Sequence, residues 1–347
     1  MDRIRAAIVG GSGYGGGELL RLLAAHPFVE VVEVTAQRAA GKPVHAIHEN
    51  LLGTSDLVFT DRAPPALARE VDVLFFALPH GEAAGRMREV FDAAPPVRVI
   101  DLSGDFRLRD PEAWAAAYGK PHPAPDLLAS FVYGCPEAAR EEVRAARRVA
   151  NPGCFATGAI LALLPLARSG RLEGRVAVNG VTGSSGSGTD PKPGTHHPER
   201  AADFRAYRPL VHQHVPEIEA ALRAAGARGL SLAMVPHSGP FVRGIFTTAY
   251  FFPASPLSSP EVAALYRATC EGEPFLRLRS ETPRVGVVCG TNYGDLSFAV
   301  SADGRTVVCL SAIDNLVKGM AGQAIQNLNL MFGLEETAGL RAPGMHP

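Results

Sequence analysis

The apolar residues of the first 150 positions fall into short runs separated by stretches with a helical pattern. Four runs predict buried β-strands, at residues 4–9, 29–35, 71–78 and 97–102. Residues 18–25 predict a helix that ends at His26, because the residue before a proline is disfavoured in helices. Strands that alternate with helices are typical of βαβ units. We therefore expect residues 1–150 to form an α/β, Rossmann-type domain with a doubly wound parallel sheet.

The pattern changes after residue 150. One apolar helix is predicted at residues 159–167, with a proline inside it. Strand-like stretches then follow one another more closely, at residues 176–181, 230–235, 246–252, 285–289, 296–300 and 307–312. This spacing predicts an α+β substrate and dimerisation domain with a mixed or antiparallel sheet at residues 151–314. A last helix is predicted over 315–331, and we expect residues 315–347 to pack back on the first domain and complete it.

The composition excludes several classes of protein. Of the 347 residues, 46% are hydrophobic and 20% are charged, with a net charge of −1. Nucleic acids and membranes usually require a basic face, so we expect neither as a partner and expect a small-molecule substrate instead. No apolar run reaches the roughly 18 residues of a membrane span, and the N-terminus lacks the pattern of a signal peptide. We therefore expect a cytoplasmic protein.

The five cysteines form neither a disulfide pattern nor a zinc pattern. They are far apart in the sequence, and no Cys-x-x-Cys pair occurs. Structural zinc sites usually contain such pairs, so we expect no metal. Isolated cysteines in a reducing compartment are usually small buried hydrophobic residues, and we expect this of Cys270, Cys289 and Cys309.

A glycine-rich turn follows the first predicted strand. Gly11, Gly13 and Gly16 fit G-x-G-x-x-G, and Gly10, Gly13 and Gly16 fit the looser G-x-x-G-x-x-G. Glycine lets the backbone approach a pyrophosphate, and the free N–H groups at the start of the next helix bind it. Because the turn joins a strand to a helix within one βαβ unit, it predicts a dinucleotide site.

The end of the second predicted strand indicates which dinucleotide binds. An NAD site usually has Asp or Glu there to accept hydrogen bonds from the ribose. Here residues 35–38 read Thr-Ala-Gln-Arg, and Glu33 lies earlier, inside the strand. Arg38 can pair with a 2′-phosphate, and Lys42 can add to this contact. The sequence therefore predicts NADP as the cofactor.

Cys154 directly follows an Asn-Pro-Gly turn and precedes the predicted apolar helix. A thiol at a helix N-terminus lies at the positive end of the helix dipole, which lowers its pKa from about 8.5 and favours the thiolate. The Pro-Gly turn leaves the side chain accessible, whereas a structural cysteine would more naturally lie inside the helix. Cys154 is therefore the predicted nucleophile.

Histidines that can exchange protons with this thiol lie at residues 211–217, Val-His-Gln-His-Val-Pro-Glu. If the segment is extended, His212 and His214 project to one face, and either can serve the thiol or the hydride acceptor. Glu217 can orient an imidazole through its second nitrogen. His196 and His197 form a second pair. No further ligands with zinc spacing accompany them, so we do not expect a metal here.

Together, these segments resemble the N-acetyl-gamma-glutamyl-phosphate reductases of arginine biosynthesis over nearly the whole chain. The matching motifs are at residues 11–16, 77–81, 101–108, 132–137, 151–154, 212–218, 243–244, 290–293 and 314–319. The Cys and His motifs are specific, whereas the glycine turn alone is not. The resemblance implies reduction of an acyl phosphate to an aldehyde by NADPH, through a thioester on the cysteine.

The resemblance also assigns roles to individual residues. Cys154 would be the nucleophile and His212 the general base. The cofactor contacts would be Gly10, Ser12, Gly13, Tyr14, Gly15, Ala36, Gln37, Arg38 and Asn315. The substrate contacts would be Ser103, Arg107, His214 and Arg243. We also expect a homo-oligomer, either a dimer or a tetramer.

Two features depart from this family. Gln213 stands where an Arg is usual, so another cation must bind the substrate's anionic group if that is the role of the Arg; Arg205, Arg208 and Arg243 are the candidates. Residues 195–200, Thr-His-His-Pro-Glu-Arg, instead resemble the sister reductases of lysine biosynthesis, whose aminoadipyl phosphate is carried on a small acidic protein. The Asn-Pro-Gly before Cys154 favours the arginine enzyme, which we predict.

Two other functions fit the sequence less well. Aspartate-semialdehyde dehydrogenase performs the same chemistry on a shorter substrate, but residues 101–108 and 212–218 argue against it. A non-catalytic NADP-binding sensor would not need the cysteine and histidine motifs, and the fold alone cannot decide function.

Overall fold

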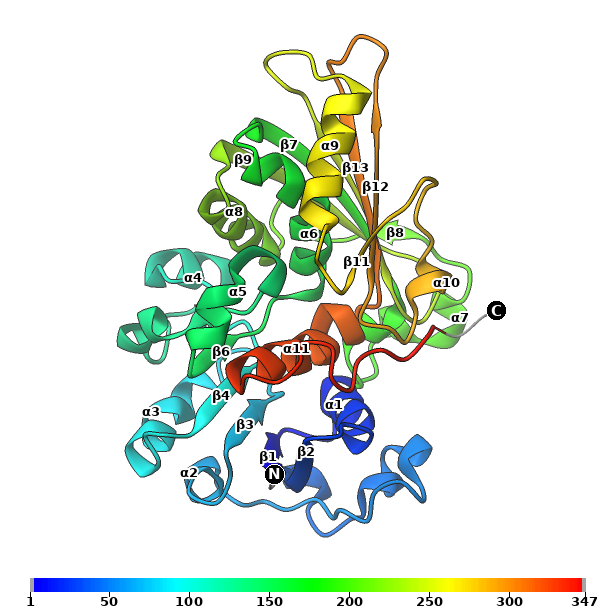
Figure 1. Ribbon diagram of the computed structural model, residues 1–347. Coiled ribbons are helices and arrows are strands. Elements are labelled where there is room, and N and C mark those ends of the chain that lie inside the picture. The colour runs from blue at the N-terminus through cyan, green and yellow to red at the C-terminus, as the bar shows by residue number, and fades with distance from the viewer. Residues whose placement is uncertain (1–2, 345–347) are drawn as a thin grey trace. The chain divides into compact units, whose positions relative to one another are not determined.

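The computed structural model describes residues 3–344, which form two compact units. One contains residues 3–152 and 320–341, and the other contains residues 153–319 and 342–344. Each unit has a β-sheet of its own, and Figure 1 labels most elements of both.

The sheet of the first unit has six strands in the order β2-β1-β3-β4-β6-β5, and every neighbouring pair is parallel. The strands are β1 (Ile4–Val9), β2 (Val29–Thr35), β3 (Val73–Phe76), β4 (Arg98–Asp101), β5 (Val132–Tyr133) and β6 (Arg148–Ala150). The predicted parallel α/β sheet is therefore confirmed. The strand order reverses at β1, between β2 and β3, and ligands of such sheets bind beyond the carboxyl ends of the strands at this point.

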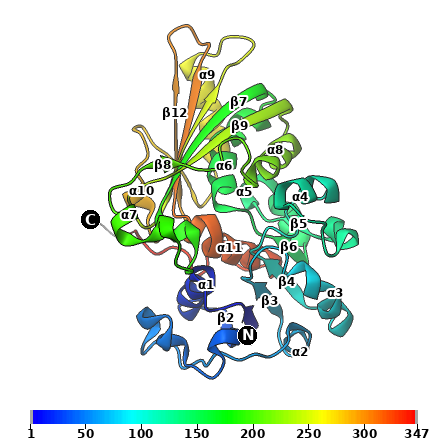
Figure 2. The same ribbon diagram turned by 180° about the vertical axis from the view of Figure 1, so that it is seen from behind.

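The helices of the first unit are α1 (Tyr14–Ala24), α2 (Pro64–Ala68), α3 (Ala84–Ala93), α4 (Pro111–Tyr118), α5 (Pro136–Ala145) and α11 (Gly322–Met331). Helix α1 begins four residues before the predicted start. The glycines of its first turn permit this, since a Cβ on Gly16 would lie 2.6 Å from the Cα of Gly11. Helix α11, red in Figure 1, contacts α5, α1 and β4, and both views show it beside α5 (Figure 2).

The second unit has a seven-stranded mixed sheet in the order β11-β12-β13-β10-β7-β9-β8. Its strands are β7 (Glu173–Thr182), β8 (Arg205–Ala206), β9 (Arg228–Ser238), β10 (Ile245–Phe251), β11 (Leu276–Leu278), β12 (Gly294–Val300) and β13 (Val307–Ile313). Helices α6 (Cys154–Arg168), α8 (His214–Ala224) and α9 (Ser259–Cys270) pack on the sheet and on one another. The predicted mixed sheet is confirmed.

Other predicted elements also differ from the structure. Residues 285–289 were expected as a strand but form the short helix α10 (Val285–Val288), followed by Gly290 with a φ of +78°. Only Val288 in this helix is buried, so local turn hydrogen bonds, rather than a neighbouring strand, satisfy the backbone. The last helix also begins later than residue 315, because a π-helical turn, Val317–Ala321, precedes α11.

Candidate active site

The glycine turn after β1 has an open position where a pyrophosphate could approach. Gly10 has a φ of +90°, and a Cβ there would lie 2.6 Å from the carbonyl oxygen of Ala77. A Cβ on Gly13, in contrast, would meet no atom within 4 Å. Gly13 is the N-cap residue of α1, and no acidic residue occupies the first turn of this helix. The N–H groups at the start of α1 therefore remain available to an anion, which fits a dinucleotide phosphate.

The residues after β2 fit a phosphorylated ribose. Gln37 and Arg38 are exposed in a short 3-10 helix, Gln37–Ala39, and Arg38 has no ion-pair partner among residues 3–344. Glu33, the nearest acid in β2, accepts a hydrogen bond from the hydroxyl of Thr60 at 2.7 Å and pairs with Arg62 at 3.1 Å. The carboxylate of Glu33 is thus already hydrogen-bonded, whereas the guanidinium of Arg38 has no carboxylate partner in the described part of the chain.

Cys154 is the first residue of α6 and is half-buried. Gly153 is the N-cap, the first turn carries no acidic side chain, and the N–H of Gly153 donates to Oε1 of Glu217 at 2.7 Å. Gly319 also lies against this cysteine, because a Cβ there would be 2.8 Å from the Cβ of Cys154. The thiol therefore sits at the positive end of a 15-residue helix, in a turn that is tied to α8.

The other described thiols are less acidic than usual or fully buried. Burial raises the pKa of Cys270 to about 11 and that of Cys309 to about 12. Burial and the charge of Asp314 raise the pKa of Cys289, and Cys135 is fully buried. None of these four is suited to act as a thiolate nucleophile at neutral pH.

The segment that contains His212 and His214 is not extended, so the condition under which both side chains would project to one face is not met. His214 begins α8, and its backbone N–H donates to Nδ1 of His212 at 3.3 Å. Both side chains are buried, with ring centroids 4.7 Å apart, and the ring of Phe155 lies 5.6 Å from that of His212. The pair is brought beside the cysteine turn because α8 packs on α6.

The electrostatics of this cluster keep the histidine neutral. Burial, and then the positive charge of Arg208, lower the pKa of His212 to about 4. Since Nδ1 accepts a hydrogen bond, the neutral ring carries its hydrogen on Nε2. Tyr207 packs edge-on against His212, and burial and the charge of Cys154 raise its pKa. Tyr207 is a neighbour of the thiol that no sequence motif pointed out.

The low pKa of His212 should make the protein sensitive to acid. The unfolded histidine binds a proton below about pH 6.5 and the folded one only below about pH 4, so this group's contribution to stability is complete above pH 6.5 and decreases down to pH 4. We expect the melting temperature of the wild type to fall more over this window than that of His212→Asn. Parallel pH dependences would show that His212 titrates normally.

The predicted substrate contacts lie in two places. Ser103 and Arg107 belong to the first unit and are buried. The hydroxyl of Ser103 donates to Asp101 at 2.7 Å, and Arg107 donates to the carbonyl oxygens of Asn151 and Leu102, both at 2.8 Å. Burial, and then the charge of Asp105, raise the pKa of Asp101 to about 7. These contacts brace the loop after β4 and the chain that leads to Cys154.

Arg243 and Asn315 belong to the second unit, where they share one hydrogen-bond network. Arg243 forms two hydrogen bonds, at 3.0 and 3.2 Å, with the fully buried carboxylate of Asp314. Asn315 Oδ1 accepts from the N–H of Gly244 at 2.7 Å, and Nδ2 donates to Ser185 at 3.0 Å. Asp314, rather than Asn315, caps the following turn by accepting from Leu316 and Val317. A cofactor contact of Asn315 stays a prediction.

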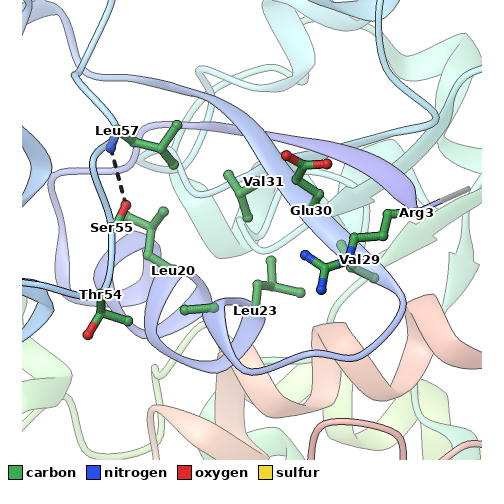
Figure 3. A pocket seen from close by; sticks show the side chains of 10 residues that line it. Arg3, Leu20, Leu23, Val29, Glu30, Val31, Thr54, Ser55 and Leu57 are labelled. Carbon is green, nitrogen blue, oxygen red and sulfur yellow. Dashed lines mark hydrogen bonds between the residues drawn. The ribbon is translucent and has the colours of Figure 1, made fainter.

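A surface pocket of about 160 Å³ in the first unit is separate from these residues. Figure 3 shows it between α1, β2 and the loop at residues 54–57, and none of the predicted site residues lines it. Among residues 3–344, no group of three or more His, Cys, Asp or Glu side chains is arranged to hold a metal ion. The helices of the same residues include none that is both long and apolar enough to cross a bilayer.

Comparison with models of known protein families shows to which family this chain belongs. Residues 5–146 match the NAD binding domain of semialdehyde dehydrogenases, and residues 154–315 match the semialdehyde dehydrogenase dimerisation domain. The chain belongs to the semialdehyde dehydrogenase family. It is therefore an oxidoreductase with an NAD(P)-binding domain, and its dimerisation domain suggests a homo-oligomer.

Curated relatives within this semialdehyde dehydrogenase family carry two names at similar identity. A putative LysW-L-2-aminoadipate 6-phosphate reductase of Thermomicrobium roseum is 46% identical, with 99% of each chain covered. An N-acetyl-gamma-glutamyl-phosphate reductase of Methanopyrus kandleri is also 46% identical, with 98% of each chain covered. An aspartate semialdehyde dehydrogenase II from Vibrio cholerae has the same fold, with a TM-score of 0.71 and 15% identity over 96% of this chain and 99% of the other.

Proposed function

We propose that this semialdehyde dehydrogenase reduces N-acetyl-gamma-glutamyl phosphate with NADPH to N-acetyl-glutamate semialdehyde and phosphate. The observation that carries the proposal is the position of Cys154, half-exposed at the start of α6 and beside the neutral, buried ring of His212. This arrangement supports covalent catalysis, in which one difficult reduction is divided into two easier steps.

In the first step, the Cys154 thiolate attacks the acyl carbon, and the C–O bond to the phosphate breaks. The electron pair leaves with the phosphate, and a thioester remains on the cysteine. The start of α6 stabilises the thiolate, because Gly153 and Cys154 lie at the positive end of the helix. Glu217 fixes the turn through the N–H of Gly153 and so positions the sulfur.

In the second step, NADPH held by residues 10–15 and 36–38 would supply a hydride, and the thioester on Cys154 would become a thiohemiacetal oxyanion. A base with a pKa of about 4 binds a proton poorly at pH 7, so we assign His212 a different role from the general base that the resemblance implied. Its Nε2–H donates a hydrogen bond to the oxyanion. The oxyanion then re-forms the carbonyl and expels the Cys154 thiolate, and the released phosphate takes from water the one proton that the overall reaction consumes.

A second candidate is reduction of an aminoadipyl phosphate bound to a carrier protein. Two observations favour it: the Thr-His-His-Pro-Glu-Arg sequence at residues 195–200 and the relatives that carry this name. The Asn-Pro-Gly turn before Cys154 favours the arginine enzyme, so we keep the free acetylated substrate as the proposal.

The reverse reaction tests both candidates. Purified protein is mixed with NADP⁺, phosphate and one semialdehyde at a time, and the absorbance of NADPH is followed at about 340 nm. We expect N-acetyl-glutamate semialdehyde to be oxidised with the higher kcat/KM. Preference for the carrier-bound aminoadipate semialdehyde would support the second candidate, and oxidation of aspartate semialdehyde alone would contradict both.

We also propose NADP as the cofactor, held by the turn at residues 10–15 and by residues 36–38. We expect Arg38→Ala to weaken NADPH binding by about 1–3 kcal/mol, the cost of losing a hydrogen bond to a charged group, and to leave NADH binding nearly unchanged. Isothermal titration with both cofactors measures this difference. Arg62→Ala is the matched control, because this arginine pairs with Glu33 and Glu70. Equal losses for NADPH and NADH would contradict the assignment.

The sheet of the second unit supports a homo-oligomer. Residues of β10 alternate between buried and partly exposed, and Phe246 and Tyr250 lie on the partly exposed face. We propose that this face forms the contact between copies of the chain. Phe246→Glu should therefore shift the mass measured by light scattering towards the monomer, because it would place a charge in the apolar interface. An unchanged mass would place the contact elsewhere.

A further inference from the structure

We propose that Arg208 and Arg200, close to Tyr207, form the subsite that holds the carboxylate of the substrate's acyl chain. The inference rests on the proposed function and answers the question raised by Gln213, which replaces the arginine usual between the two histidines. The inference assigns the binding of the substrate's anionic group to arginines that precede His212 in the chain.

Among residues 3–344, no carboxylate forms an ion pair with the guanidinium of Arg208. Its Nη1 donates to Oε1 of Gln213 at 2.9 Å, and this neutral amide is its hydrogen-bond partner among residues 3–344. The two alternative cations are already paired: Arg243 with Asp314, and Arg205 with Asp203 at 3.0 Å. Of the three candidates, Arg208 is thus the one whose charge is free for a ligand.

Arg208 is also close to the reacting groups. The hydrogen bond to Gln213 holds the guanidinium of Arg208 next to the His212–His214 pair. The charge of Arg208 contributes to the lowered pKa of His212. The ring centroid of Tyr207, the residue before Arg208, lies 6.0 Å from that of His212. The charge of Cys154 contributes to the raised pKa of Tyr207. An anion bound at Arg208 would therefore lie close to His212 and to Cys154.

The backbone holds Arg208 in an unusual conformation. Arg208 and Leu210 have φ angles of 43° and 65°, and they are the non-glycine residues with positive φ among residues 3–344. Hydrogen bonds to β9 fix the turn at both ends, from Tyr207 to Pro236 at 3.0 Å and from Leu210 to Met234 at 2.9 Å. Strained residues that are held in this way are concentrated at ligand sites.

Arg200 supplies a second donor. It is buried, with 7% of its surface exposed, and its Nη2 donates to the carbonyl oxygen of Gly239 at 2.5 Å. Its Nη1 is buried and has no hydrogen-bond partner among the described residues. Gly239 lies three residues after Pro236, which accepts from the N–H of Tyr207, so Arg200 lies near the turn that carries Tyr207 and Arg208. A buried guanidinium nitrogen without an acceptor is costly, and a bound carboxylate would supply the acceptor.

The chemistry favours the carboxylate over the phosphoryl group as the bound anion. The phosphate leaves after the first step, whereas the carboxylate stays on the acyl chain through both steps and can hold the thioester in place for reduction. Guanidinium groups also match the planar carboxylate in two-point contacts.

The reverse reaction separates these two anions, because the semialdehyde and phosphate are then independent substrates. We expect Arg208→Gln to raise the KM for the semialdehyde by about 10–100-fold, the range for one lost charged hydrogen bond. The KM values for phosphate and NADP⁺ should stay within about threefold, as should kcat, and Arg208→Lys should recover part of the loss. Arg223→Gln removes an exposed arginine of α8, paired with Glu219, and should change nothing.

Two results would overturn the inference. A rise in the KM for phosphate alone would assign Arg208 to the leaving group, and unchanged constants in Arg208→Gln would remove it from the substrate site. The same kinetic constants are measured for Arg200→Gln. Its melting temperature is measured as well, because Arg200 is buried and its replacement can affect stability. If the wild type oxidises none of the semialdehydes, the proposed function fails instead, and the two failures are thereby distinguished.

Discussion

Replacing Cys154 with alanine is expected to reduce turnover by about 10⁴-fold or more while NADPH still binds with its wild-type affinity. The thiol is half-exposed at the first position of α6, so its loss leaves no large cavity in a core. The chemistry depends on it, because no other described thiol is both accessible and able to ionise near neutral pH. Stopped-flow kinetics and cofactor titration measure the two quantities.

Chemical labelling provides an independent measurement of the same role. Iodoacetamide at neutral pH should modify Cys154 first, and the acyl phosphate should protect it, because a thioester would occupy the sulfur. Cys289→Ala is the matched control, since Cys289 is half-buried too but has a raised pKa. If Cys289 carried the first label and Cys154→Ala still turned over, the assignment of the nucleophile would be wrong.

Replacing His212 with alanine is expected to lower kcat by about 10²–10³-fold, the usual loss when a donor to an oxyanion is removed. The ring is neutral at pH 7 and has its hydrogen on Nε2, so its proposed contribution is a hydrogen bond and not a proton. His212→Asn should therefore recover at least about tenfold of the loss, since an amide nitrogen can donate in place of the ring. Steady-state kinetics at pH 7 compare the variants.

The contrary outcome has a specific meaning. If His212→Asn is as slow as His212→Ala, proton transfer is the role of the ring, as in the general-base assignment. His214→Asn is the comparison, because the hydrogen bond to His212 comes from the backbone N–H of His214 and is kept in this variant. We expect it to raise KM more than it lowers kcat. A lowered melting temperature with normal kinetics in both histidine variants would leave them a structural role only.

Local sequence determined the elements of the first unit well. The strands at residues 4–9 and 29–35 agree with β1 and β2 residue for residue, because both segments are rich in apolar residues and the turn residues that follow them mark their ends. The glycine turn and Cys154 at a helix start were predicted as well. These features depend on residues close together in the sequence, because they follow from the backbone freedom of glycine and from the exposed turn before a helix.

Tertiary structure decided the arrangement of the second half of the site. Alternation suggested that His212 and His214 share the face of a strand, but packing of α8 on α6 places a helix start there instead. The valines of residues 285–288 favoured a strand, yet no strand of the described chain pairs with them, and they form a helical turn.

The ion pairs and the pKa values of the site could likewise not be predicted from the sequence. Which arginine is free depends on partners far along the chain, such as Asp314 for Arg243, which is 71 residues away. The low pKa of His212 depends on burial that only the folded chain produces. The sequence by itself therefore determined the fold class and predicted which residue types react. Long-range packing and desolvation decided which side chains remain free to bind, because both depend on contacts that no local pattern records.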